Sequence, residues 1–244
     1  MAAESDVALS LNLLSVPHVL CVMWRVVSLL YWYEATQGGL WGGRGRDLGR
    51  LLTMLCLSEL AEGPIAFFPF NRAAVLVIKV LNQGLLFSLL FLVHGLRESQ
   101  AVPMSGRHRL CFALMVENCA AYRLSWNYVQ TAELAIGLFS QVLGLGPAVL
   151  PPLQLALLAA CVLATAYTEL AFLQKFRWTF AAHIPIQLWA ASLYQQSALS
   201  GRIVCVLVVL NALLVVKKLT VACKETAPKK QQCLTDGDEQ LLEV

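Results

Sequence analysis

Residues 73–96, AAVLVIKVLNQGLLFSLLFLVHGL, decide the fold class, because this run has 24 residues and only one Lys, Arg, Asp or Glu, Lys79. An α-helix needs about 20 predominantly apolar residues to cross the hydrocarbon core of a bilayer. The run is therefore long enough to form a transmembrane helix.

The rest of the chain has the same apolar character. Of its 244 residues, 58% are hydrophobic and 14% are charged, and the mean hydropathy is +0.66. Soluble domains are about 25% charged and about 45–50% apolar, so the composition excludes a soluble globular protein and a disordered one. The net charge of +3 is small and dispersed along the chain, which argues against nucleic acid as a partner.

Clusters of glycine, proline and charge divide the chain into apolar runs. Seven runs are predicted to span the membrane: Ser10–Tyr33, Leu51–Phe68, Ala73–Leu96, Leu110–Gln130, Leu153–Phe172, Thr179–Tyr194 and Gly201–Val216. An eighth run, Ala132–Leu150, is rich in glycine and ends at Pro151, so it either crosses the bilayer or forms a re-entrant or interfacial helix. We predict an all-α, polytopic helical membrane protein with about seven transmembrane helices, within a range of six to eight.

The basic residues predict the orientation. If Ala132–Leu150 does not cross and the N-terminus is outside, thirteen of the 18 Lys and Arg face the cytoplasm, as the positive-inside rule requires. They are Arg44, Arg46, Arg50, Arg97, Arg107, Arg109, Lys175, Arg177, Lys217, Lys218, Lys224, Lys229 and Lys230. We thus expect a transmembrane bundle over residues 1–216, in the plasma membrane or an endomembrane, and a disordered cytoplasmic tail over residues 217–244. In this tail, Cys223 is a candidate palmitoylation site.

Several charged residues lie inside the predicted spans, where a lone charge at the bilayer centre costs at least about 2.5–3.5 kcal/mol. They are Arg25, Glu59, Glu62, Lys79, Glu117, Arg123 and Glu169. Snorkelling towards the headgroups explains Arg25 and Lys79, but not the short Glu59 and Glu117 side chains near the middle of their spans. Buried partners are therefore expected for both carboxylates.

Glu59 and Glu62 lie three residues apart, on one face of the second predicted helix. Two carboxylates so close in a low dielectric require a nearby cation, such as Lys79 or Arg25, or a bound proton. They form either a polar path for protons or cations or an ion-paired anchor that fixes the helix register.

The fourth predicted span is unusually polar. Glu117 and Arg123 are six residues apart, about 240° around a helix, so they must find partners on different neighbouring helices. Amide side chains can add hydrogen bonds between helices. The predicted intramembrane polar cluster consists of Glu59, Glu62, Lys79, Asn82, Glu117, Asn118 and Arg123.

Enzyme motifs are absent from the sequence. The four histidines lie in separate segments without HExxH spacing, and no GxSxG or Walker motif occurs. We therefore expect no metal, no cofactor and no enzymatic activity. An intramembrane enzyme that uses the buried carboxylates as acid and base is a less favoured alternative.

Two short motifs resemble the XK-related family of membrane proteins. Trp24-Arg25-Val26-Val27-Ser28-Leu29-Leu30 is similar to an aromatic-Arg-Val helix of that family, and Arg107-His108-Arg109 followed by Leu110–Val116 and Glu117-Asn118 is similar to a late helix. The resemblance covers about residues 20–169. It implies a helical protein linked to phospholipid scrambling or small-solute transport, often with a partner subunit. The chain is shorter than the family's members and lacks their first half.

The polar cluster predicts a transporter or scramblase that handles membrane lipids or a small solute, or a subunit that works with a partner membrane protein. The alternative is a structural, adaptor or receptor-like membrane protein whose cytoplasmic tail binds a partner.

Overall fold

The computed structural model describes residues 19–31, 50, 53–61, 71–98, 106–146, 148–172, 176, 178–194 and 198–226, and this part of the chain contains helices and no strand. Two helical segments come first, Val19–Tyr31 and residues 53–61. The helices that follow are α3 (Arg72–Glu98), α4 (Gly106–Phe112), the π-helix η1 (Ala113–Glu117), α5 (Asn118–Leu143), α6 (Leu150–Ala171), α7 (His183–Tyr194) and α8 (Ala198–Thr226).

Three helices among the described residues are long and apolar enough to cross a membrane. They are Arg72–Arg97 in α3, Leu150–Ala171 in α6 and Gly201–Val221 in α8. Large apolar side chains such as Leu81 and Val206 are about two-thirds exposed on α3 and α8, as expected where a helix faces lipid. The described residues confirm the predicted all-helical class, and the three apolar helices agree with a membrane protein.

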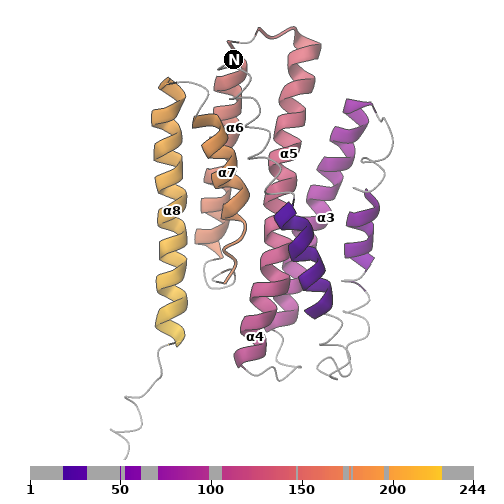
Figure 1. Cartoon of the computed structure of the whole chain (residues 1–244), viewed down its shortest axis with the longest axis vertical. Helices are drawn as coiled ribbons and strands as arrows, with labels where there is room; N and C mark the ends of the chain where they lie inside the picture. The colour runs from indigo at the N-terminus through magenta and orange to yellow at the C-terminus, as the bar shows by residue number, and fades with distance from the viewer. Residues whose placement is uncertain are drawn as a thin grey trace, which may run out of the picture.

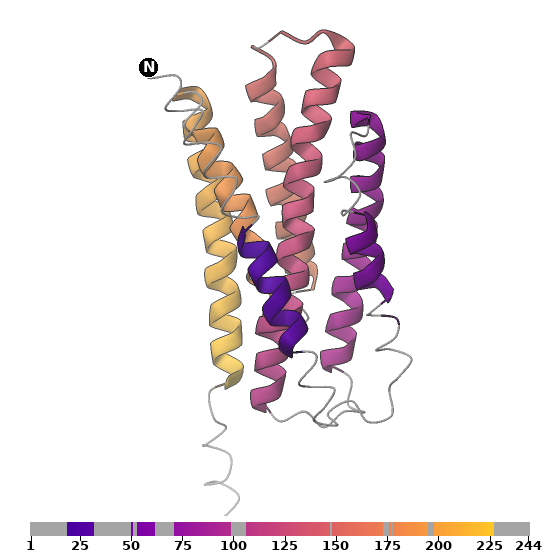
Figure 2. The ribbon, with the colours of Figure 1, turned by 45° about the vertical axis from the view of Figure 1, so that its right-hand side comes forward.

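The helices form a bundle in which successive long helices alternate in direction (Figures 1 and 2). The helix α5 lies at its centre and packs against α3, α6 and α7, while α8 packs against α6 and α7. One apolar core surrounds Trp126 of α5 and Trp189 of α7, and a second surrounds Leu89 of α3 and Phe112 of α4. Because both cores contact α5 or its N-terminal extension, this helix holds the two sides of the bundle together.

The prediction of a separate helix at Ala132–Leu150 is wrong. Residues 106–143 form one helical column of α4, η1 and α5, so Ala132–Leu143 continues the fourth predicted span. Gly144 ends α5 in the left-handed conformation (φ 61°), and its N–H donates to the carbonyl of Ser140. The chain then turns into α6, whose first turn contains Pro151 and Pro152, where a missing N–H costs no helical hydrogen bond.

Two further boundaries differ from the predictions. The sixth predicted span contains only the 12-residue helix α7, about 18 Å long, which is shorter than the roughly 30 Å hydrocarbon core. The last helix continues past Val216 to Thr226, so the first ten residues of the predicted disordered tail are helical. Parts of the first two predicted spans, residues 10–18, 32–33, 51–52 and 62–68, and the tail from 227 to 244 lie outside the described residues.

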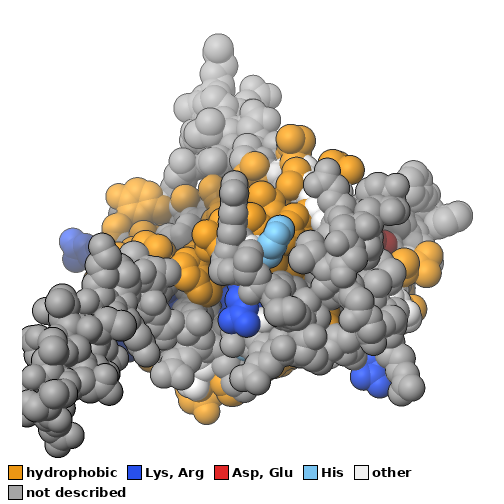
Figure 3. Space-filling model, turned by 90° about the horizontal axis from the view of Figure 1, so that it is seen from below, with side chains coloured by type: hydrophobic (Ala, Val, Ile, Leu, Met, Phe, Trp, Pro, Cys, Tyr) orange, Lys and Arg blue, Asp and Glu red, His pale blue; other side chains and the backbone are white. Residues whose placement is uncertain are grey.

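Basic side chains gather at the end of the bundle where α4 begins and α8 ends. Among the described residues seen from this end, Lys and Arg appear at several places and Asp or Glu only at one edge (Figure 3). Arg109 of α4 and Lys217 of α8 are exposed. Arg72 at the start of α3 and Arg202 near the start of α8 are exposed as well.

Candidate functional site

A cluster of buried polar and charged side chains lies where α3, η1, α5, α6, α7 and α8 converge. We call it the charged cluster, and its members are at most 6% exposed. It consists of His94, Arg97, Glu117, Asn118, Glu169, Thr179, His183, Asn211 and Lys218.

One half of the charged cluster is centred on Glu117, whose side chain is fully buried. Arg97 Nη1 lies 2.8 Å from Glu117 Oε2, and Thr179 Oγ1 donates a hydrogen bond of 2.6 Å to Glu117 Oε1. His94 Nδ1 lies 3.8 Å from the same Oε1 atom. An arginine from α3 therefore compensates the carboxylate at the end of η1, as a buried charge requires.

The other half is centred on Glu169 of α6. Lys218 donates to Glu169 Oε1 and also to the carbonyl oxygen of Thr179, at 2.6 Å. His183 Nε2 lies 2.9 Å from Glu169 Oε1, and His183 Nδ1 lies 2.5 Å from Asn211 Oδ1. Thr179 joins the two halves, because its hydroxyl binds Glu117 and its carbonyl accepts from Lys218.

Asn118 holds the irregular backbone between α6 and α7. Its Nδ2 donates to the carbonyl of Trp178 at 2.7 Å, and its Oδ1 accepts from the N–H groups of Phe180 and Ala181 at 2.7 and 2.8 Å. Inside a membrane protein, non-helical backbone is tolerated only where the protein or a water-filled cavity satisfies its polar groups. Asn118 and Lys218 do so here for the carbonyls of Trp178 and Thr179 and for the N–H groups of Phe180 and Ala181.

The π-helix places Asn118 for this role. Over Ala113–Glu117 the helix widens, and the Asn118 side chain donates to the carbonyl of Ala113 at 2.8 Å in addition to Trp178. Single π-turns inside α-helices occur frequently at functional sites. Here the π-turn lies next to the connection between α6 and α7, so two irregular stretches of backbone meet at Asn118.

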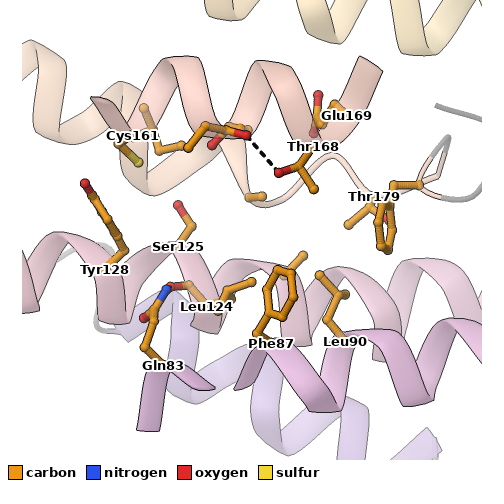
Figure 4. Close-up of a pocket in the computed structure, with 16 residues that line it drawn as sticks. Gln83, Phe87, Leu90, Leu124, Ser125, Tyr128, Cys161, Thr168, Glu169 and Thr179 are labelled. Carbon is orange, nitrogen blue, oxygen red and sulfur yellow. Dashed lines mark hydrogen bonds between the residues drawn. The ribbon is translucent and has the colours of Figure 1, made fainter. Parts of the chain in front are cut away.

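A cavity of about 200 Å³, the inner cavity, lies beside this connection, between α3, α5 and α6. Figure 4 shows Ser125 and Tyr128 of α5 opposite Thr168 of α6, with Thr179 at one end. Thr168 donates to the carbonyl of Ala164 at 2.8 Å. Among the described residues, the buried atoms Ser125 Oγ and Glu169 Oε2 have no hydrogen-bond partner. Both residues line the inner cavity, where water or a polar solute could satisfy them.

A second set of charges lies on the other side of α5. The carboxylate of Glu59 bridges two guanidinium groups, with Arg25 Nη1 at 2.8 Å from Oε2 and Arg123 Nη2 at 2.9 Å from Oε1. Arg123 also donates to Ser58 Oγ at 2.9 Å, and Ser58 donates to Asn82 Oδ1 at 2.8 Å. Arg25, Glu59 and Arg123 line a larger cavity of about 690 Å³, the lateral cavity.

The structure divides the predicted polar cluster. Glu59, Asn82 and Arg123 belong to the lateral set, and Glu117 and Asn118 belong to the charged cluster. Lys79 belongs to neither, because its Nζ donates to Gln130 Oε1 at 2.7 Å instead of pairing with Glu59.

Two predictions about the partners of these charges are confirmed. Glu59 has the predicted partner Arg25, and Glu117 and Arg123 bind partners on different helices. Glu62 lies outside the described residues, as does the side chain of the palmitoylation candidate Cys223, whose backbone is part of α8.

Sequence reasoning missed important members of the charged cluster. Arg97 and Lys218 were assigned to the cytoplasmic side, but they are 3% and 1% exposed. The available signal was helical spacing, since Lys218 follows Asn211 by seven residues and Arg97 follows His94 by three, which places each pair on one helix face. His183 and Thr179 gave no comparable signal.

The described residues contain no group of three or more His, Cys, Asp or Glu arranged to hold a metal ion. Comparison of the chain with models of protein families, with curated proteins and with solved structures finds no match.

Proposed function

We propose that the protein moves a lipid or a small solute across its membrane, alone or as a subunit beside a partner membrane protein, and that it is not an enzyme. One observation carries the proposal. The charged cluster binds the described backbone of the connection between α6 and α7 and lies beside the inner cavity, whose lining includes Ser125 and Glu169, each with a buried polar atom that has no hydrogen-bond partner. Buried intramembrane charges commonly mark transport paths.

The proposed orientation follows from the basic end of the bundle. The count of Lys and Arg along the sequence supports a cytoplasmic position for the end of the bundle where α4 begins and α8 ends, the end at which Arg109 and Lys217 are exposed. The resemblance to XK-related proteins agrees with lipid movement as one form of the proposed activity.

Purified protein in liposomes tests the proposal. Scrambling of fluorescent NBD-phospholipids, measured by dithionite quenching, reports lipid movement, and stopped-flow light scattering with glycerol, urea and alanine reports solute entry. We expect one of these rates to exceed that of protein-free vesicles. If neither rate does, the proposed function is wrong.

Glu117→Gln tests the role of the charged cluster, because it removes the charge that faces Arg97 and keeps the shape of the side chain. We expect the transport rate to fall about tenfold, the loss for roughly 1.4 kcal/mol of barrier. Glu133→Gln is the matched control, since Glu133 lies in the same helical column, in α5, outside the charged cluster, and accepts from Trp189 Nε1 at 2.5 Å. Equal losses in both variants, at equal amounts of reconstituted protein, would argue against a transport role for Glu117.

A further inference from the structure

The lateral cavity has the dimensions of a ligand site. It lies between the helix Val19–Tyr31, the helix 53–61, α3 and α5, and its volume of about 690 Å³ falls within the roughly 300–1,000 Å³ of small-molecule pockets. Most of its lining is aliphatic, including Val22, Leu89 and Val93. Such a wall favours an acyl chain over a polar solute.

The outer rim of the lateral cavity is apolar and exposed. Val26, Leu29 and Leu60 line the cavity and are 52%, 55% and 68% exposed. The helix α3, which also borders the cavity, has exposed aliphatic side chains of its own, such as Val77 and Leu81. A ligand can therefore enter from the hydrocarbon layer without crossing water.

The inner end of the cavity carries the opposite chemistry. Arg25 and Arg123 converge on the two oxygens of one carboxylate, that of Glu59, and Arg123 is 3% exposed. Among the described residues, the buried Nε atom of Arg123 has no hydrogen-bond partner. Guanidinium groups bind carboxylate and phosphate oxygens in the same forked geometry. Glu59, whose side chain is 47% exposed, thus occupies a position that suits an oxyanion.

We propose that the lateral cavity binds the phosphate headgroup and one acyl chain of an anionic phospholipid, and that the phosphate replaces the Glu59 carboxylate between Arg25 and Arg123. The aliphatic wall holds the chain, and the two guanidinium groups select the headgroup. The inference rests on the proposed function only in one respect, that the bound phospholipid is also the molecule transported. Binding of the phospholipid can be measured without transport.

Cys56 provides the measurement. It lines the lateral cavity and is exposed, while Cys205 of α8 is exposed and lies outside the cavity. The full-length chain in detergent is alkylated with N-ethylmaleimide, and peptide mass spectrometry follows each cysteine. We expect dioleoyl phosphatidate to slow alkylation of Cys56 about tenfold and to leave Cys205 unchanged.

Two further additions identify what is recognised. Dioleoylglycerol has the same chains without the phosphate, and inorganic phosphate has the anion without the chains. We expect neither to protect Cys56. Protection by dioleoylglycerol equal to that by phosphatidate would overturn the proposed headgroup site, and protection by inorganic phosphate alone would replace the lipid with a soluble anion.

Variants test the residues. Arg123→Gln should abolish protection, whereas Glu59→Gln should lower the phosphatidate concentration needed for half-protection, because the competing carboxylate is gone. Arg202→Gln, an exposed arginine on α8, is the control and should behave as the parent protein. If Arg123→Gln does not elute as a folded species in gel filtration, Arg25→Gln replaces it, since that side chain is 24% exposed.

The proposal is overturned if phosphatidate protects Cys56 equally in the arginine variants and the parent, or if Glu59→Gln raises the concentration needed. If protection of Cys56 depends on Arg25 and Arg123 but the protein shows no transport in liposomes, the proposed function is wrong and the lipid-binding site stands.

Discussion

Lys218 shows how a residue near the end of a membrane helix can become part of its core. It is 1% exposed, and it contacts Glu169 and the backbone of Thr179, whereas the adjacent Lys217 is exposed. Removing one partner of a buried ion pair leaves the other charge without compensation, which is more damaging than removing both.

Lys218→Met should therefore lower the stability by about 3–5 kcal/mol, because the Glu169 carboxylate loses its lysine in a low-dielectric site. Thermal unfolding in detergent measures the change as a lower midpoint temperature. The double variant Lys218→Met with Glu169→Leu should recover part of the loss. Lys217→Met is the control and should have little effect, so equal destabilisation at positions 217 and 218 would contradict the buried pair.

The sequence predicts some charges of the site better than others. The sequence identifies Glu59, Glu117 and Arg123 because each lies inside an apolar run. A charge there has a high free-energy cost in the bilayer unless it has a buried partner. The sequence does not identify Lys218 and Arg97, because they lie at the ends of their runs, where a long basic side chain can equally reach the headgroups. Only the folded structure identifies Thr179 as part of the site, since its role depends on the irregular backbone around it.

At the scale of elements, the turn from α5 to α6 converts a predicted eighth run into a hairpin. The glycine and proline residues of this run indicate that a helix ends there. The apolar pattern alone could not show that the helix ends at residue 144 rather than at residue 131, before the run. The placement depends on Gly144, which adopts a conformation that other residues avoid. The column of α4, η1 and α5 contains 38 residues, about 57 Å, so it extends beyond a hydrocarbon core of roughly 30 Å.

Gly144→Ala should destabilise the protein by about 1–2 kcal/mol, the cost of a Cβ atom in the left-handed conformation. The measurement is again the midpoint of thermal unfolding. Gly146→Ala is the matched control, because Gly146 has open space around its Cβ position and no positive φ. If both variants unfold at the same temperature, the left-handed cap does not limit stability.

At the scale of the whole molecule, the sequence predicted the class because apolar length is a one-dimensional property. The sequence could not show which apolar runs cross the membrane, because this depends on how the helices pack against one another. The polar α5 is sheltered by α3, α6 and α7, and the short α7 is supported by α8. Both helices depend on neighbours for burial, and neither is among the three described helices that are long and apolar enough to cross a membrane.

The C-terminal region separates transport from the adaptor alternative. Removing residues 227–244 leaves α8 intact to Thr226, including Lys218, so a transporter should keep its liposome rate within about twofold. An adaptor should instead lose co-purification of its partner while the bundle stays folded. Truncation at 217 is the contrasting variant, because it also removes Lys218 and should destabilise the bundle as Lys218→Met does. A 227–244 deletion that abolishes transport in a folded protein would show that the function depends on the tail, in disagreement with a path through the charged cluster alone.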